Sequence, residues 1–288
     1  MTAAAQRKDR GWRFATPFSW PLRPLVMGIV NVTPNSFSDG GRFLDPSAAV
    51  SHGLRLAAEG ADLVDVGGES TRPGAEPVPP QQEMDRVLPV LERLVREGVA
   101  VSVDTLKPEV MRAAIAAGAR VVNDVSGFRS DAALAAVAPA ADVGLVVMHM
   151  QGSPRTMQAS PRYDDVVSEV GAFLRERAAA LEAAGVAPGR IAIDPGFGFG
   201  KSLAHNRALF HAIPAFASMG YAVMAGVSRK RMIGDVTGRP LGERLAGSVA
   251  AAMLAVQAGA RIVRVHDVNE TVDALAVLRA LGSSEEEE

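Results

Sequence analysis

The sequence of 288 residues contains no cysteine. This absence excludes disulfides, thiolate nucleophiles and cysteine-ligated zinc or iron–sulfur centres, and it removes any argument for an oxidising compartment. No run of eighteen or more apolar residues offers a membrane span. The opening segment, MTAAAQRKDRGWRF, lacks the apolar core of a secretory signal. We therefore expect a cytoplasmic protein that has no membrane partner.

The chain also carries little net charge, with a formal value of -2 at pH 7 and a sequence pI near 6.2. Proteins that bind nucleic acid present clustered Lys and Arg side chains that neutralise phosphates. We therefore expect no nucleic-acid partner. Hydrophobic residues make up 48% of the sequence, which is typical of a globular chain with a large core. This length would suggest two domains, but α/β barrels often reach it as one.

Short apolar runs alternate with longer segments rich in Ala, Leu and charged residues, which is the pattern of a parallel α/β sheet. The apolar runs are Leu25–Val30, Leu63–Val66, Val99–Val103, Arg120–Val122, Gly144–Met148, Arg190–Ile193, Tyr221–Val227 and Arg261–Val265. Helix formers at helical spacing fill segments such as Ser47–Glu59, Gln81–Glu97, Tyr163–Ala184 and Gly242–Ala258. Glycines stand where predicted helices end, a place that favours positive φ, at Gly60, Gly98, Gly118, Gly185 and Gly259.

Eight continuous apolar runs, with no break in composition between them, favour one closed barrel over two doubly wound domains. We therefore predict the α/β class and a single (β/α)8 TIM barrel over residues 23–282. An N-terminal extension, 1–22, precedes this barrel, and an acidic tail, 283–288, follows it.

Polar side chains follow every predicted strand. Barrel enzymes carry their chemistry at this end of the strands, where the βα loops converge on one face. In chain order the residues are Asn31, Glu69 to Arg72, Asp104, Asn123 with Asp124, His149, Asp194, Ser228 to Lys230, and Arg264 with His266. We expect them to form one ring that contains both signs of charge.

Several members of this ring have a structural explanation as well. Asp104 or Thr105 could cap the next helix, since both residue types are preferred at that position. The pair Asn123–Asp124 could belong to a turn. For His149 we favour a buried histidine that is hydrogen-bonded to backbone.

Three cations are harder to explain in this way. Arg264 and His266 alternate at the end of an apolar strand, and Lys230 stands in a loop on the same face. These cations would be unpaired at the barrel mouth unless an anion binds there. The pattern therefore indicates an anionic ligand.

Other catalytic motifs are incomplete. The segment 194–202 resembles a phosphate loop, but Pro195 replaces the first glycine of a Walker A motif and Lys201 the last glycine of a dinucleotide fingerprint. Lys230 replaces the final glycine of a nucleophile elbow around Ser228. No spacing of histidines and carboxylates indicates a fixed zinc site. We expect any metal to arrive with a phosphate, as Mg²⁺ commonly does.

A series of motifs between about Leu25 and Leu281 resembles the dihydropteroate synthase family. They are Met27 to Pro34, Ser36 to Gly41, Asp65 to Gly74, Ser102 to Thr105, Val122 to Asp124, Met148 to Gly152, Asp194 to Lys201, Ser228 to Lys230, and Arg264 to Asp267. The family usually has Asp where Asn35 stands in the first loop, although Asp39 is present.

The resemblance implies condensation of 6-hydroxymethyl-7,8-dihydropterin pyrophosphate with p-aminobenzoate, which gives dihydropteroate and pyrophosphate for folate biosynthesis. It implies loss of pyrophosphate before the amine attacks, with Asp39, Arg72, Asp104 and Lys230 as catalytic residues. It also implies a homodimer, and sulfonamides that compete with p-aminobenzoate.

The same resemblance divides the ring among three ligands and one metal. The pterin residues are Asp104, Asn123, Met148, Asp194 and Lys230. The pyrophosphate residues are Asn31, Arg264 and His266, with Asn31 also at Mg²⁺. The p-aminobenzoate residues are Phe37, Thr71, Arg72, Pro73, Phe199 and Ser228, in loops that would close once pyrophosphate is present.

Two alternatives remain. A pterin-binding methyltransferase barrel would use a similar Asp and Asn set but needs no pyrophosphate site, so Arg264 and His266 argue against it. A silent paralogue would bind a pterin or a partner protein without turnover and should have lost catalytic residues. Residues such as Asn31, Asp104 and Lys230 are all present, which argues against that role.

Overall fold

The computed structural model describes residues 18–33, 46–71 and 74–282. Eight parallel strands form a closed barrel in chain order. The strands are β1 (Leu25–Asn31), β2 (Leu63–Gly67), β3 (Val101–Asp104), β4 (Val121–Asp124), β5 (Gly144–Met148), β6 (Ile191–Asp194), β7 (Ala222–Ala225) and β8 (Ile262–Val265). The barrel closes between the first and last strands, where Leu25 pairs with Ile262. The prediction of a (β/α)8 barrel is therefore confirmed.

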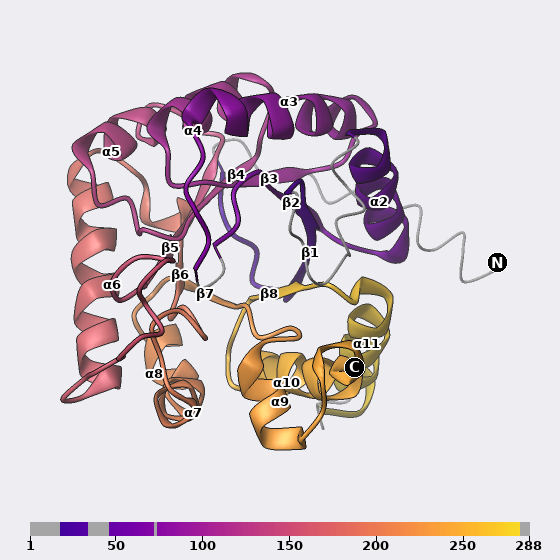
Figure 1. The fold of residues 1–288 in the computed structure, drawn as a ribbon, viewed down its shortest axis with the longest axis vertical. Coiled ribbons are helices and arrows are strands. Elements are labelled where there is room, and N and C mark those ends of the chain that lie inside the picture. Colours follow the sequence, from indigo (N-terminus) through magenta and orange to yellow (C-terminus); the bar gives the residue numbers. More distant parts are fainter. Residues whose placement is uncertain (1–17, 34–45, 72–73, 283–288) are drawn as a thin grey trace, which may run out of the picture.

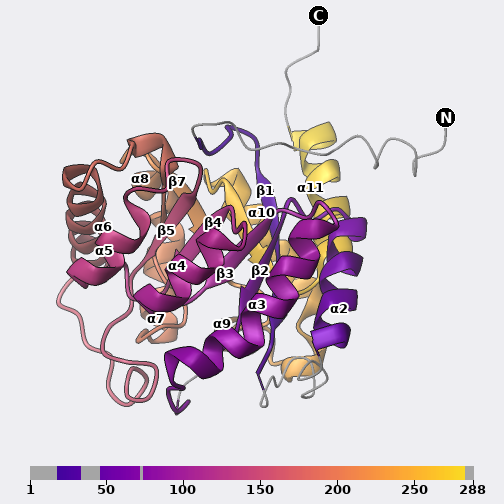
Figure 2. The same ribbon diagram turned by 90° about the horizontal axis from the view of Figure 1, so that it is seen from above.

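Helices surround this barrel (Figure 1). They are α2 (Pro46–Glu59), α3 (Pro80–Arg96), α4 (Pro108–Ala116), α5 (Asp131–Val137), α6 (Val166–Ala183), α7 (Leu203–His211), α8 (Ile213–Ala217), α9 (Arg231–Thr237), α10 (Leu245–Gln257) and α11 (Val268–Gly282), with 3-10 turns η1 (Pro188–Arg190) and η2 (Leu241–Glu243). The ring closes where α11 lies beside α2 (Figures 1 and 2).

The predicted element boundaries agree with the structure to within about two residues for most elements. The apolar run Gly144–Met148 is strand β5, whereas the longest predicted run, 221–227, contains a strand only over Ala222–Ala225. The glycines predicted to end helices have positive φ, from 79° at Gly98 to 107° at Gly60. The local pattern was therefore sufficient to locate both kinds of element.

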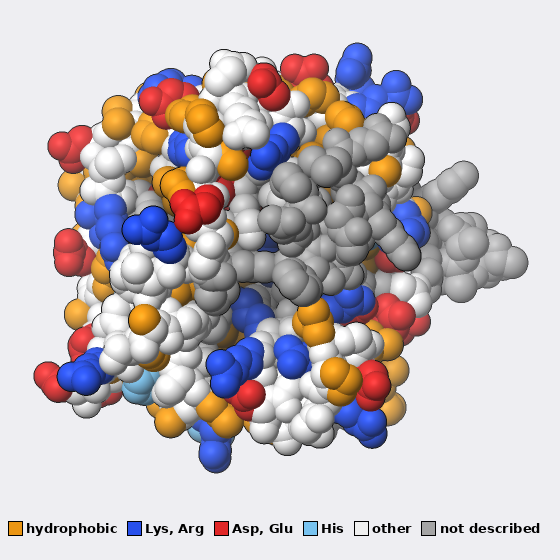
Figure 3. All heavy atoms as spheres, in the orientation of Figure 1, with side chains coloured by type: hydrophobic (Ala, Val, Ile, Leu, Met, Phe, Trp, Pro, Cys, Tyr) orange, Lys and Arg blue, Asp and Glu red, His pale blue; other side chains and the backbone are white. Residues whose placement is uncertain are grey.

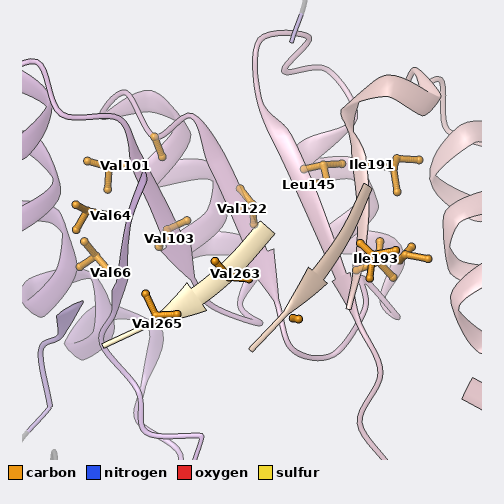
Figure 4. Close-up of a cluster of buried hydrophobic side chains, with 14 of the residues drawn as sticks. Val64, Val66, Val101, Val103, Val122, Leu145, Ile191, Ile193, Val263 and Val265 are labelled. Atoms are coloured by element: carbon orange, nitrogen blue, oxygen red, sulfur yellow. The ribbon is translucent and has the colours of Figure 1, made fainter. Parts of the chain in front are cut away.

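The hydrophobic core has two parts because side chains alternate across each strand. Outward-facing residues such as Val64, Val66 and Val103 lie on the helix side of their strands (Figure 4). Inward-facing residues form a separate cluster, which comprises Leu25, Met27, Leu63, Val121, Val146, Ala192, Ala222, Met224 and Ile262, together with Phe18 and Trp20.

Phe18 and Trp20 close the N-terminal end of the barrel. The Trp20 Nε1 donates to the carbonyl of Arg190 at 2.9 Å, and a side chain on Gly144 would overlap the Phe18 ring. Packing against the barrel therefore begins within the segment expected as an extension. With this end filled by apolar side chains, polar ligands can reach the interior from the opposite end.

Among the described helices, none is both long enough and apolar enough to cross a bilayer. Over the described part of the face in Figure 3, basic and acidic side chains are interspersed around the rim.

Candidate functional site

A layer of charged and polar side chains lies inside the barrel above the apolar cluster. Asp65 on β2 is fully buried at its centre. The Arg264 guanidinium donates from Nε to Asp65 Oδ2 at 2.6 Å and from Nη2 to Asp104 Oδ2 at 3.0 Å. Asn123 donates from Nδ2 to the same oxygen of Asp65 at 3.2 Å. Strands β2, β3, β4 and β8 therefore contribute to one buried network.

The expectation that Arg264 lacks a partner is wrong. Two carboxylates, from Asp65 and Asp104, pair with it, and together they outweigh the effect of burial and raise the pKa of Arg264. We predicted no role for Asp65 from the sequence, although it is a charged residue at an inward-facing position of an otherwise apolar strand. That pattern was the available signal, because a buried carboxylate requires a partner.

The capping explanation for Asp104 is also wrong. Lys107 is the N-cap residue of α4, without a side-chain capping bond, and Asp104 points instead to Arg264. The turn explanation is confirmed for Asp124, whose carboxylate accepts from the backbone N–H of Ser126 and Phe128, each at 2.7 Å.

Three acceptors in the buried network have no hydrogen-bond partner among the described residues. These atoms are Asp65 Oδ1, Asp104 Oδ1 and Asn123 Oδ1. A buried acceptor without a donor costs roughly 1–3 kcal/mol, so the site favours a ligand that supplies N–H groups here. Burial raises the pKa of Asp104 to about 7, although the positive charge of Arg264 acts in the opposite direction.

A second group of charges converges around Gly226, the residue that follows β7. A Cβ placed on Gly226 would lie 3.8 Å from Lys230 Nζ and 3.9 Å from both Asp194 Oδ2 and Arg264 Cβ. Burial raises the pKa of Asp194, opposed by the charge of Lys230, and burial lowers the pKa of Lys230 to about 8. The glycine therefore leaves open space between these side chains.

The glycine-rich loop after β6 has a structural reason that differs from phosphate binding. Gly196, Gly198 and Gly200 have φ values of 71°, 79° and 65°, and a side chain on Gly196 would overlap the carbonyl oxygen of His149. Positive φ and close approach both favour glycine. Between these glycines Phe199 is half-buried, with its ring centroid 4.5 Å from Lys230 Nζ.

His149 is buried, as expected, but its side-chain partner is a lysine rather than backbone. Its Nδ1 lies 3.0 Å from Lys201 Nζ, and burial, together with that charge, lowers the pKa of His149 to about 3. Lys201 also donates to the carbonyl of Phe199 at 3.0 Å. The pair therefore supports the loop that carries Phe199, a connection that the sequence interpretation did not anticipate.

Residues after β7 and β8 are held together at the edge of the mouth. Ser228 Oγ lies 3.1 Å from His266 Nδ1 and accepts from the His266 backbone N–H at 3.2 Å. Arg229, which has a positive φ of 56°, donates from Nε to Asp267 at 3.0 Å. These contacts fix His266 relative to Ser228.

Asn31 at the end of β1 completes the described ring. A Cβ on Gly67 would lie 3.9 Å from Asn31 Oδ1 and 3.8 Å from Asp104 Oδ2, so both oxygens border the same space. Met148, at the end of β5, is buried in a cluster with Val125, Met150 and Met157. The structure thus brings the described ring members to one end of the barrel.

Other predicted site residues lie outside the described residues. These are Phe37, Asp39, Arg72 and Pro73, together with the departure at Asn35. Thr71 is described and is half-buried in the β2–α3 loop. Within the described ranges, no group of three or more His, Asp or Glu side chains could hold a metal ion.

Comparison with known proteins identifies the family. A family model described as pterin binding enzyme matches residues 27–266. A dihydropteroate synthase of Neisseria meningitidis serogroup C is 50% identical over 264 residues, which cover 90% of this chain and 93% of that protein. The chain belongs to the dihydropteroate synthase family.

Solved dihydropteroate synthases share the fold. A Xanthomonas albilineans synthase with 4-aminobenzoic acid has a TM-score of 0.85 and 57% identity, covering 91% of this chain and 94% of that one. A second structure of the Xanthomonas albilineans synthase, in complex with 7,8-dihydropteroate, has a TM-score of 0.82 and 54% identity, covering 91% of this chain and 95% of that one. A Yersinia pestis synthase in a sulfonamide drug complex has a TM-score of 0.87 and 44% identity, covering 91% of this chain and 95% of that one.

Proposed function

We propose that this chain condenses 6-hydroxymethyl-7,8-dihydropterin pyrophosphate with p-aminobenzoate to form dihydropteroate and pyrophosphate, as expected of a dihydropteroate synthase in folate biosynthesis. The observation that carries this proposal is the set of unsatisfied acceptors, Asp65 Oδ1, Asp104 Oδ1 and Asn123 Oδ1, beside the cation Arg264. Such a site suits a flat ligand with several N–H donors and an anionic substituent.

The pterin is assigned to the buried end of the site. Its ring amide and amino groups present donors to Asp104, Asn123 and Asp194, and Lys230 can donate to its acceptor atoms. Met148 is buried at the end of β5, where it would supply an apolar contact for the ring. The interior below Asp65 is filled, so the pterin can enter only to the depth of the polar layer.

The pyrophosphate is assigned to the outer end, with Asn31, Arg264 and His266 around it. Arg264 donates to the two carboxylates from Nε and Nη2. Its Nη1 makes no hydrogen bond among the described residues and is therefore available to an anion. Charge on the leaving oxygens grows as the bond to carbon breaks, so fixed donors here favour the transition state.

Mg²⁺ fits this outer end as an ion that arrives with pyrophosphate. Magnesium prefers oxygen ligands and usually takes one or two from protein and others from phosphate or water. Asn31 Oδ1 would hold it, and it borders the same space as Asp104 Oδ2. When bound, the ion would neutralise charge on the leaving group.

p-Aminobenzoate is assigned to the outer loops, near Thr71, Phe199 and Ser228. The half-buried Phe199 ring offers an apolar surface beside Lys230. Ser228 and the N-terminus of α9 would receive the carboxylate. Phe37, Arg72 and Pro73 remain predictions for this ligand, and sulfonamides are expected to compete at the same place.

The proposed reaction is dissociative. The bond between the pterin methylene carbon and the pyrophosphate oxygen breaks first, which leaves a cationic methylene. The nitrogen of the arylamine then forms the new bond to carbon and loses a proton. The buried carboxylate of Asp104 favours the cation, and positioning of the amine contributes much of the remaining rate. Asp39 and Arg72 remain predictions for the catalytic step.

The alternatives have less support. Relatives at about half identity over nearly the full chain are synthases, which favours that activity over methyl transfer. The presence of Asp104, Lys230 and Arg264 in one mouth disfavours a silent paralogue. A homodimer and a cytoplasmic location remain predictions.

Turnover is tested most simply with purified protein, both substrates and Mg²⁺. We expect stoichiometric release of pyrophosphate and formation of dihydropteroate, followed by chromatography. Omission of p-aminobenzoate should prevent formation of dihydropteroate. A protein that binds the pterin substrate but makes no dihydropteroate at saturating concentrations would refute the proposed activity.

The pyrophosphate assignment is tested by His266→Ala. The substitution removes one hydrogen-bond donor to the pyrophosphate, so the affinity for the pyrophosphate-bearing substrate should fall about tenfold. The affinity for free 6-hydroxymethylpterin should stay as in the wild type. Titration calorimetry with both ligands measures the difference. Equal loss of affinity for both ligands would show that His266 acts on the pterin or on the fold.

The electrostatic role of Asp104 is tested by Asp104→Asn, which we expect to lower kcat by at least about tenfold. Because the ionised form is required and burial raises the pKa of Asp104 to about 7 in the free protein, kcat/KM of the wild type for the pterin substrate should rise with pH through about 7 and level off above it. The variant should lose this acid limb. An unchanged kcat, or an acid limb that persists in the variant, would contradict the role.

A further inference from the structure

A buried ionic cluster of Glu69, Glu83 and Lys107 lies beside the predicted p-aminobenzoate loop, outside the set of residues assigned to ligands. Lys107 Nζ donates to Glu69 Oε2 at 2.6 Å and also to Glu83 Oε2. The side chains of Lys107 and Glu69 are 12% and 11% exposed, and that of Glu83 is fully buried. Ion pairs this deeply buried are costly unless their geometry is good, so the cluster needs an explanation.

Lys107 retains its charge in this environment. Burial alone would lower the pKa of Lys107, but hydrogen bonds and charges from Glu69 and Glu83 outweigh that effect and raise it. The lysine therefore joins three segments at one point: the β2–α3 loop through Glu69, the first turn of α3 through Glu83, and the β3–α4 loop to which Lys107 belongs.

Glu69 connects the two ends of the β2–α3 loop. The Oε2 atom that receives Lys107 also accepts from the backbone N–H of Val78 at 2.8 Å. One carboxylate oxygen therefore bridges positions nine residues apart in the chain. Thr71 lies within the segment that this bridge encloses, two residues after Glu69.

The start of the same loop is also pressed against α3. A Cβ on Gly68 would lie 2.7 Å from Val87 Cγ1 and 3.1 Å from the carbonyl oxygen of Glu83, a spacing that only glycine permits. Arg86 Nη1 donates to the Gly68 carbonyl at 2.8 Å. The backbone that leads to Glu69 therefore has little freedom to shift.

We propose that Lys107 and Glu69 are positioning residues for p-aminobenzoate: the ion pair sets the path of the β2–α3 loop and thereby places Thr71 at the mouth. The inference rests on the proposed function, because it takes that loop as part of the p-aminobenzoate site. Lys107 follows Asp104 by three residues in the chain. The ion pair therefore also fixes the β2–α3 loop relative to the end of β3, where Asp104 is assigned to the pterin.

Steady-state kinetics with both substrates varied separately tests the proposal. Glu69→Gln keeps the shape of the side chain but removes the charge that pairs with Lys107. We expect the KM for p-aminobenzoate to rise about tenfold, while the KM for the pterin pyrophosphate changes by less than about twofold, because only one of the two ligands contacts the loop. Glu97→Gln, which removes an exposed carboxylate paired with Arg93, is the matched control and should change neither value.

A second variant separates positioning from stability. Lys107→Met alone would leave two buried carboxylates facing each other, so it is combined with Glu83→Gln, which removes one of those charges. The double variant should fold and show the same selective rise in KM for p-aminobenzoate. Wild-type KM values in Glu69→Gln, or equal rises for both substrates in either variant, would overturn the proposal. A wild-type protein without turnover would instead refute the proposed function.

Discussion

The ion pair of Arg264 with two carboxylates inside the barrel is the interaction on which the rest of the site depends. Taking these charges out of water is costly, and the cost is offset only when each has a partner with good geometry. Asp65 supplies that partner from a fully buried position, and it also receives the side-chain amide of Asn123. The direction of Arg264 and the orientation of Asn123 are therefore set by one carboxylate. Asp104 completes the network with one oxygen, and its second oxygen remains available to a ligand.

The fold supports this network by what it places below and around it. Phe18 and Trp20 fill the far end of the barrel, so polar ligands meet the network at the end of the interior that remains open. Gly67 and Gly226 leave space beside the charged side chains that a larger side chain would occupy. The described barrel interior is thus filled by apolar side chains at one end and carries charged side chains at the other. This arrangement allows a flat nitrogen-rich ring to be held at the base while its anionic substituent lies toward the loops.

The sequence was sufficient to predict the barrel, because strand and helix periods alternate clearly and glycines with positive φ follow several of the helices. Among the described residues it was also sufficient to predict that the polar side chains after the strands lie at one end of the barrel, since the ends of parallel strands meet there. It was not sufficient to predict partners across the barrel. Asp65 and Arg264 are 199 positions apart, and no local spacing connects them. Likewise, the contact of His149 with Lys201 depends on a loop whose glycines looked like a phosphate motif. Pairings of this kind depend on the closed barrel and can be read only from the structure.

The most direct test of the account is the affinity of 6-hydroxymethylpterin for Asp65→Asn, measured by titration calorimetry at pH 8. Asp65 is not among the proposed ligand contacts, and its Oδ2 accepts from both Arg264 and Asn123, so we expect the substitution to act through these two residues. We expect a folded variant that binds the pterin at least about tenfold more weakly than the wild type, a difference of about 1.4 kcal/mol. A folded variant whose affinity lies within about twofold of the wild type would show that the buried ion pair does not organise the site.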